Sequence, residues 1–215
     1  MLRADGSAVV TLLTPAGALL DGDDIRVTVA CLPGTDVTLR QTGATRLHRC
    51  PGPGIRSAIE VRVAHGARFR YLPFELIPFA DSAYTQTIRL DLEPGARACV
   101  SEVVSPGRLQ EHFRYRRLRL RTEAFLSGAT IMVDAQQIEP GRTDCERMLG
   151  GFTHFGSLFV FGPGLGQHDA DEIHERFAEY GVLGSASLLP SYGIGARVVG
   201  NNADPLLTAL QGLPA

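Results

Sequence analysis

The chain contains no lysine and no tryptophan among its 215 residues, and it carries no large surplus of either charge. Its 21 basic residues, all arginine, stand against 23 acidic ones, which gives a formal net charge of -2. A polyphosphate backbone is bound by surplus positive charge, so this balance argues against a nucleic-acid partner. The missing tryptophan removes the usual stacking platform of β-solenoid enzymes that act on sugars.

The chain has four cysteines, and no two of them form a C-x-x-C pair. Their wide spacing matches neither a zinc knuckle nor a redox motif. Free thiols in a reducing compartment fit this pattern best, and the residues concerned are Cys31, Cys50, Cys99 and Cys145.

Long hydrophobic runs are also absent. No apolar stretch approaches the roughly 18 residues that are needed to span a bilayer. Threonine and proline interrupt the apolar start at residues 8–20, which favours a first strand and turn over a signal peptide. We therefore expect a cytoplasmic protein with no membrane partner.

The motifs of common enzyme classes are missing. No G-x-S-x-G nucleophile elbow occurs, and no H-x-H with a later acid suggests a cupin-type metal site. The stretch GPGLGQ before a predicted helix has Gln167 where a dinucleotide fingerprint needs its third glycine. We expect no enzymatic activity and no catalytic residue.

Glycine and proline are abundant, with 24 and 13 residues, which favours many turns and a mainly β protein. A chain of this length suits one domain, here residues 1–215. We expect a β body over residues 1–148 and a small α+β part with two helices over residues 149–215.

A strand-turn-strand pattern occurs three times in the first half. The turns contain Gly34, Gly66 and Gly95, and two of them read Pro-Gly, which suits a type II turn with positive φ at the glycine. A unit that recurs about every 30 residues is typical of stacked layers that bury their apolar faces on each other. The repeat predicts a layered, solenoid-like β body; an antiparallel sandwich with similar hairpins is the alternative.

Two later stretches interrupt the strand pattern. Pro73 and Pro78 cannot donate to a ladder, so we expect the segment after Tyr71 to leave the layer and either expose a docking surface or cover a sheet edge. In FRYRRLRLR, Phe113 and Tyr115 share the parity of the arginines, and a β-bulge near Arg116 would restore the phase. That charged run is either a solvated strand face or a docking surface for an acidic partner.

The C-terminal third predicts strand, helix, strand and helix. Residues 158–161 form a short apolar run, and Asp169 with Glu172 forms a capping box for a helix that Gly181 ends. SYGIGARVVG reads as the last strand, and Asp204 before proline starts the final helix.

Two clusters could hold a metal ion or serve only the fold. His48 and Cys50 share a predicted strand face. The helix that Gly181 ends offers three further side chains near its start. Packing and helix capping are the structural interpretations of the same residues. The helix candidates are His168, Asp171 and His174.

The order of motifs resembles the UreD (UreH) family of urease accessory proteins. The resemblance covers residues 12–211, with Ala16, Arg46 and Gln110 as departures from the family pattern. The matching pieces are TPAGALLDGDDIRV, RQTGATRLHR, YLPFELIPF, SEVVSPGR, QEHF, GGFTHFGSLFVFGPG and SYGIGARVVGNNADPLLTAL.

The resemblance implies a scaffold or chaperone in urease maturation. Such a protein binds the urease apoprotein and the UreF and UreG accessory proteins, and nickel passes through it without a permanently bound cofactor. Oxygen ligands hold nickel weakly enough to release it, and the acids that match family motifs are Asp23, Glu75, Glu102 and Glu111.

The implied partner-binding surface follows the proline-framed segment. Its residues are Tyr71, Leu72, Pro73, Phe74, Leu76, Ile77, Pro78, Phe79 and Arg108. The alternative is a purely structural β adaptor without metal handling, in which Asp23 closes a turn and the glutamates pair with arginines.

Overall fold

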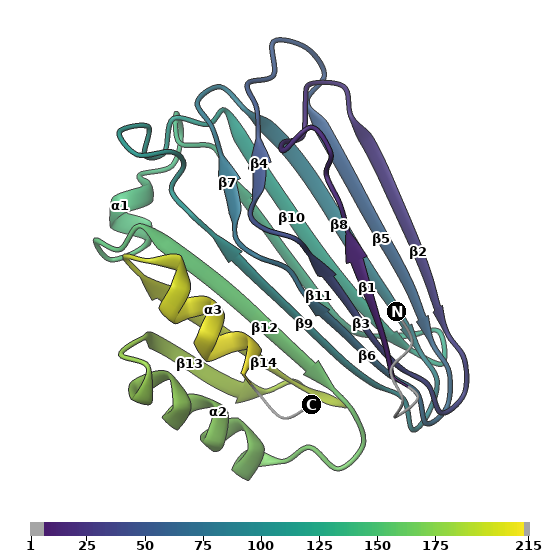
Figure 1. The fold of residues 1–215 in the computed structure, drawn as a ribbon. Helices are drawn as coiled ribbons and strands as arrows, with labels where there is room; N and C mark the ends of the chain where they lie inside the picture. Colours follow the sequence, from purple (N-terminus) through teal and green to yellow (C-terminus); the bar gives the residue numbers. More distant parts are fainter. Residues whose placement is uncertain (1–6, 213–215) are drawn as a thin grey trace.

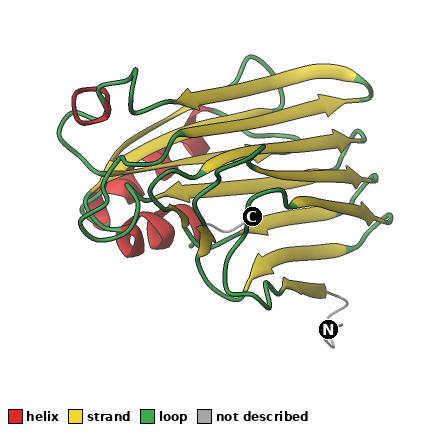
Figure 2. Ribbon diagram, turned by 90° about the horizontal axis from the view of Figure 1, so that it is seen from above, coloured by secondary structure: helices red, strands yellow, loops and turns green. Residues whose placement is uncertain are grey.

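The three strand-turn-strand units of the first half stack in parallel in the computed structural model, which describes residues 7–212 (Figure 1). Gly34, Gly66 and Gly95 have φ of 72°, 69° and 86°, as their turns require. Figure 2 shows the turns stacked along one end of the strands. The units are β2 (Asp24–Cys31) with β3 (Asp36–Gln41), β5 (Ile55–Val63) with β6 (Arg68–Leu72), and β8 (Ala83–Leu92) with β9 (Arg97–Val104).

The first strands of the units form one sheet and the second strands form the other. Sheet B has the order β11-β10-β8-β5-β2, with β10 (Arg117–Leu126) and β11 (Ala129–Ile138). Sheet A has the order β1-β3-β6-β9-β12-β14-β13, with β1 (Ser7–Leu12), β12 (His154–Phe161), β13 (Leu183–Leu188) and β14 (Gly193–Gly200). The parallel stacking confirms the solenoid-like body and excludes the antiparallel sandwich for these units.

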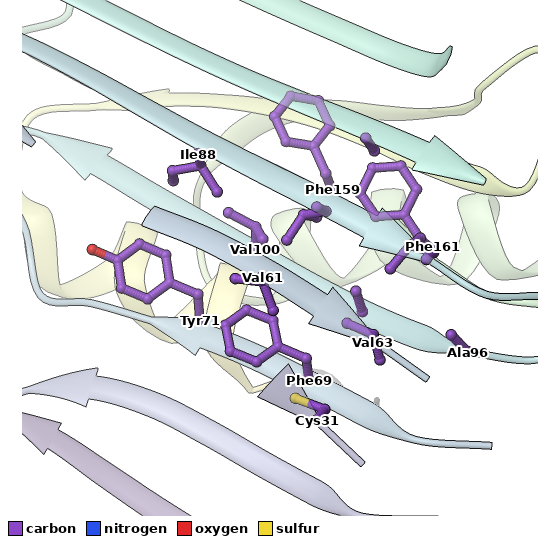
Figure 3. Close-up of a cluster of buried hydrophobic side chains, with 14 of the residues drawn as sticks. Cys31, Val61, Val63, Phe69, Tyr71, Ile88, Ala96, Val100, Phe159 and Phe161 are labelled. Atoms are coloured by element: carbon purple, nitrogen blue, oxygen red, sulfur yellow. The ribbon is translucent and has the colours of Figure 1, made fainter. Parts of the chain in front are cut away.

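Apolar side chains from both sheets meet between the layers. Every second residue of a strand faces the opposite sheet, so Val61 and Ile88 of sheet B pack against Phe69 and Val100 of sheet A (Figure 3). Figure 3 also shows Tyr71 on the side of this cluster away from Val63 and Ala96. A second apolar cluster lies at the other end of the strands and includes Leu47, Ile55 and Leu118.

The two longer helices lie against sheet A. The helices of the described residues are α1 (Cys145–Met148), α2 (Gln167–Glu179) and α3 (Ala203–Gln211). The helix α2 packs on β13 and β14, and α3 packs on β9, β12 and β14 through a third apolar cluster. Neither α2 nor α3 covers the outer face of sheet B (Figures 1 and 2). None of the helices in residues 7–212 is both long and apolar enough to cross a membrane.

The C-terminal predictions hold with corrections. The short α1 and the strand β13 are not indicated by the sequence pattern, whereas the two helices predicted for the C-terminal part are present as α2 and α3. The helix α2 begins earlier than predicted, because Gly166 is its N-cap and the Asp169 carboxylate accepts the Gly166 N–H at 2.8 Å. Asn202, not Asp204, caps α3.

The proline-framed segment leaves sheet A only briefly. It departs after β6 and returns as β7 (Leu76–Pro78), which lies between β4 (Thr45–Leu47) and β9. Main-chain groups of alternate residues face opposite neighbours, and the Leu76 carbonyl accepts the Ser105 N–H at 3.0 Å on the β9 side. The Pro78 nitrogen therefore also faces the β9 side, but at a position beyond the last residue of β9. Its missing N–H therefore costs no hydrogen bond between the strands.

The predicted β-bulge near Arg116 is wrong. The strand β10 begins at Arg117, so Phe113 and Tyr115 lie in the preceding loop and do not share its alternation. The register irregularity in this hairpin falls instead between Ala124 and Phe125. No bulge is therefore needed to explain why Phe113 and Tyr115 share the parity of the outward-facing arginines.

All four cysteines are free, as the sequence predicts, and the structure shows that all four are buried. Burial raises the pKa of Cys31 to about 11 and that of Cys99 to about 12. The thiols therefore stay protonated near neutral pH and pack as small apolar groups.

Candidate functional site

A row of polar side chains separates the two apolar clusters between the sheets. On β5, Ser57 lies between Ile55 and Ile59, and on β8, Gln86 holds the same level. In sheet A the register places Glu102 beside Ser157 and Ser157 beside Arg197. We call this row the polar belt; its members are Ser57, Gln86, Glu102, Thr122, Asp134, Ser157 and Arg197.

Glu102 is a half-buried acid in the polar belt. The Gln86 amide of sheet B donates to the Glu102 carboxylate of sheet A, and the Tyr84 hydroxyl donates to the Gln86 carbonyl at 2.8 Å. Burial raises the pKa of Glu102 to about 7, against the hydrogen bond from Gln86, which favours the charged form. Near neutral pH this carboxyl group can therefore exist in either protonation state.

One end of the polar belt is closed by an ion pair. The Arg197 guanidinium of β14 pairs with the Asp134 carboxylate of β11, so the pair joins sheet A to sheet B. The Arg197 side chain is 47 % exposed and that of Asp134 is 17 % exposed. A cavity of about 300 Å³, lined by Ile138, Leu149, Phe155 and other residues, adjoins Arg197.

Another cavity meets the polar belt from the side of β1 and β2. It has about 280 Å³ and is lined by Ser57, Tyr84 and Gln86 together with Leu12 and Ile25. A smaller space of about 20 Å³ beside Glu102 shares Gln86 with it. Water can therefore approach the belt from the side of β1 and β2.

The four predicted acids do not come together. Only Glu102 lies in the polar belt; Asp23 accepts the Leu20 N–H at 2.8 Å and closes the turn before β2. Glu111 lies 3.7 Å from Arg108, and the Glu75 carbonyl accepts an N–H from β4. Within residues 7–212, no group of three or more His, Cys, Asp or Glu side chains is close enough to hold a metal ion.

The predicted partner-binding segment is partly buried. Phe74 is 46 % exposed, and the Arg108 guanidinium lies over the Phe79 ring at 4.9 Å. Leu72, Ile77 and Phe79 are half-buried. The side chains that are buried within the fold are Tyr71, Pro73, Leu76 and Pro78.

The two histidine clusters keep structural contacts. His48 and Cys50 lie outside any strand; the His48 ring packs on Phe79, whereas the Cys50 thiol is buried and donates to the Ala83 carbonyl. On α2, His168 lies 3.1 Å from Glu172. His174 and Asp171 are exposed.

The sequence motifs did not indicate most of the polar belt. Gln86, Thr122 and Asp134 lie in none of the motifs that carry the family resemblance. Ser157 and Arg197 lie in two of those motifs, but the sequence did not single them out as site residues. The available signal was a polar residue at an inward-facing position of an otherwise apolar strand. On β8 this position is Gln86, which has the parity of the buried residues Tyr84, Ile88 and Leu90.

The chain is similar to known proteins over almost its whole length. The profile of the UreD urease accessory protein family matches residues 1–214. Proteins named "Urease accessory protein UreD" from Paenarthrobacter aurescens and Cenarchaeum symbiosum are each 30 % identical to the chain over 217 residues. The alignments cover 95 % and 97 % of this chain and 75 % and 76 % of those proteins. A protein of the same name from Mycolicibacterium gilvum is 31 % identical, over 94 % of this chain and 75 % of its own length. The chain belongs to the UreD family of urease accessory proteins.

Proposed function

We propose that the chain binds the urease apoprotein together with the UreF and UreG accessory proteins in the cytoplasm, and that nickel reaches urease through its polar belt. The family supports an accessory role in urease maturation. The observation that carries the finer proposal is Glu102, an acid held between two sheets beside a space that water can approach.

The donor atoms of the polar belt suit an ion in transit. Carboxylate, amide and hydroxyl oxygens bind nickel less tightly than thiolates do, so the ion can exchange between them and leave. The thiols lie elsewhere: Cys31, Cys50, Cys99 and Cys145 are all in the apolar clusters. Soft ligands that would trap nickel are thus kept out of the polar belt.

The ion pair at the end of the polar belt fits the same proposal. An unpaired arginine would repel a divalent cation, whereas Asp134 neutralises the Arg197 guanidinium. The protein makes and breaks no covalent bond in this proposal; nickel is its cargo. The structural adaptor remains the second candidate, because Asp23 and Glu111 have the turn and ion-pair contacts which that alternative predicts.

Co-purification tests the proposed partners. The chain is produced with tagged urease apoprotein, UreF and UreG, and the captured urease is analysed for bound protein and for nickel. We expect the chain in the complex and nickel in urease only when the chain is present. Absence of the chain from the captured complex, or equal nickel content without it, would contradict the proposal.

A further inference from the structure

The outer face of sheet B is an open, charged surface. The helices α2 and α3 lie on sheet A, so outward side chains of β2, β5, β8, β10 and β11 are not covered by them (Figure 1). Arg26, Arg56, Arg119 and Arg121 on this face are exposed. A face of this kind is free to contact another molecule.

Positive charge gathers on the half of this face that is away from the stacked turns. The register aligns Asp24, Arg56, Thr85, Arg119 and Gln137 in one row across the strands. The next rows add Arg117 on one side, and Arg26 and Arg121 on the other. On the strands of this half, five arginines thus stand against one aspartate, and Glu139, which follows β11, adds a second acid. Near the turns the signs are mixed, with Arg62 and Arg89 beside Glu60, Asp91 and Glu123.

A shallow cavity lies within the positive half. It has about 220 Å³ and is lined by Arg119 and Arg121, with Thr85, Thr87 and Ala135 as its small neighbours. Short side chains on β8 and β11 leave space on both sides of the long arginines of β10. We call this cavity the arginine hollow.

The arginines of the hollow keep donors available. Arg119 contacts only a neutral partner, because its Nε donates to the Gln137 amide oxygen at 2.9 Å. Arg121 pairs with Glu123 through Nε at 2.8 Å and through Nη2 at 2.5 Å, which leaves its Nη1 group without a contact to Glu123. Glu139, the nearest acid beyond Gln137, is already 3.6 Å from Arg142. A guanidinium has five N–H donors, so both arginines can bind a further carboxylate.

We propose that the arginine hollow docks an extended, acidic segment of a partner protein. Alternate side chains of an extended chain lie about 7 Å apart on one side, which is also the separation of Arg119 and Arg121 along β10. Two glutamates at positions i and i+2 of the segment would face these two arginines. The inference concerns the binding surface alone and holds whether or not the polar belt carries nickel.

The charge pattern favours a protein segment over a nucleic acid. Arg26 lies 3.4 Å from Asp24, and Arg121 pairs with Glu123, so part of the positive charge is already balanced. A phosphodiester chain needs an unbroken track of cations, and the acids near the turns would repel it. A segment with a few carboxylates needs only the hollow.

Titration of the 23.1 kDa chain with a designed peptide, followed by nuclear magnetic resonance, tests the proposal. The probe is an acetylated and amidated octapeptide of alternating glycine and glutamate, and its glutamine counterpart is the neutral control. We expect shifts of the Nε signals of Arg119 and Arg121 and of neighbouring β8 and β11 amides with the glutamate peptide only. Raising the salt concentration should weaken the binding.

Two double variants give the matched comparison. Arg119→Gln with Arg121→Gln should weaken peptide binding by roughly ten-fold, because two charge-assisted contacts are lost. Arg40→Gln with Arg62→Gln removes the same charge from exposed residues outside the hollow and should leave the affinity within about two-fold. Amide spectra confirm that both variants fold.

Three results would overturn the proposal. The first is equal binding of the glutamate and glutamine peptides, and the second is equal loss of affinity in both double variants. The third is tighter binding of a single-stranded DNA octamer than of the acidic peptide, which would make the face a polyanion site.

Discussion

Glu102 places an ionisable group between two β-sheets, where a charge is costly unless it is hydrogen-bonded or reached by water. The amide of Gln86 supplies a hydrogen bond, and the small space beside Glu102 lies next to a larger cavity. The raised pKa shows that these contacts offset burial only in part. A carboxyl group without a task could be replaced there by an apolar side chain, so its presence agrees with a role in handling cations.

Glu102→Gln should make the protein more resistant to unfolding at neutral pH. The pKa of Glu102 is about 7 in the folded chain and 4.5 as the ordinary value, so between these values the folded state holds the extra proton. The free energy of unfolding of the wild type therefore falls as pH rises through this window. Glutamine does not titrate, so the free energy of unfolding of the variant does not fall in this way. The difference in unfolding free energy between variant and wild type should grow between pH 5 and 7 to at most about 3 kcal/mol.

Urea unfolding at a series of pH values measures this difference. Glu111→Gln is the control, since Glu111 lies near the surface and pairs with Arg108. Parallel stability curves for the wild type and Glu102→Gln would show that Glu102 titrates normally.

Sequence reasoning found Glu102 but not its surroundings. The family motifs marked Glu102 as one of four candidate nickel ligands. Two of the others have structural contacts instead, because Asp23 closes a turn and Glu111 pairs with an arginine. Which acid faces the opposite sheet depends on how the sheets stack. Gln86 could be noticed as a polar residue on a buried strand face, but its bond to Glu102 joins residues from different sheets.

The stacked turns depend on glycine to different degrees. Gly66 has φ of 69° and its nearest atom to an added Cβ is the Gly34 nitrogen at 4.0 Å, so only the backbone conformation opposes a side chain. Gly95 has φ of 86°, and an added Cβ would lie 2.7 Å from the His65 ring. That ring also contacts the Pro94 carbonyl at 2.6 Å.

Gly66→Ala should therefore cost about 1 to 2 kcal/mol of stability, the strain of a left-handed residue. Gly95→Ala should cost more, because His65 must move as well. Urea unfolding of both variants at one pH gives the comparison. Equal losses of stability in Gly66→Ala and Gly95→Ala would mean that the contact with His65 does not add to the cost of the second substitution.

The repeat was the strongest structural signal in the sequence, and the rest was harder to predict. Alternation and glycine spacing are local, so the strands of the three repeat units, β2, β3, β5, β6, β8 and β9, could be recognised from them. The strand β13 has few apolar residues, and β7 contains a proline, so neither has an ordinary strand pattern. Their pairing with β14 and with β4 and β9 depends on tertiary contacts.

The parts of the molecule differ in their properties. The helices α2 and α3 cover the part of sheet A formed by β9, β12, β13 and β14, the space between the sheets holds the polar belt, and the outer face of sheet B carries the arginine hollow. Phe74, which precedes β7, and Arg108, which lies over the ring of Phe79 after β7, are also exposed. A scaffold that binds several proteins needs such separate surfaces, whereas a route for an ion needs the interior.

The most direct measurement is the nickel content of urease that has been matured with variants of this chain. Urease is captured with UreF, UreG and either wild-type chain, Glu102→Gln or Glu111→Gln, and nickel is determined per urease active site. We expect equal assembly in all three cases, nickel lowered to roughly half or less with Glu102→Gln, and wild-type nickel with Glu111→Gln. Wild-type nickel with Glu102→Gln in an intact complex would contradict passage through the polar belt and leave the structural adaptor.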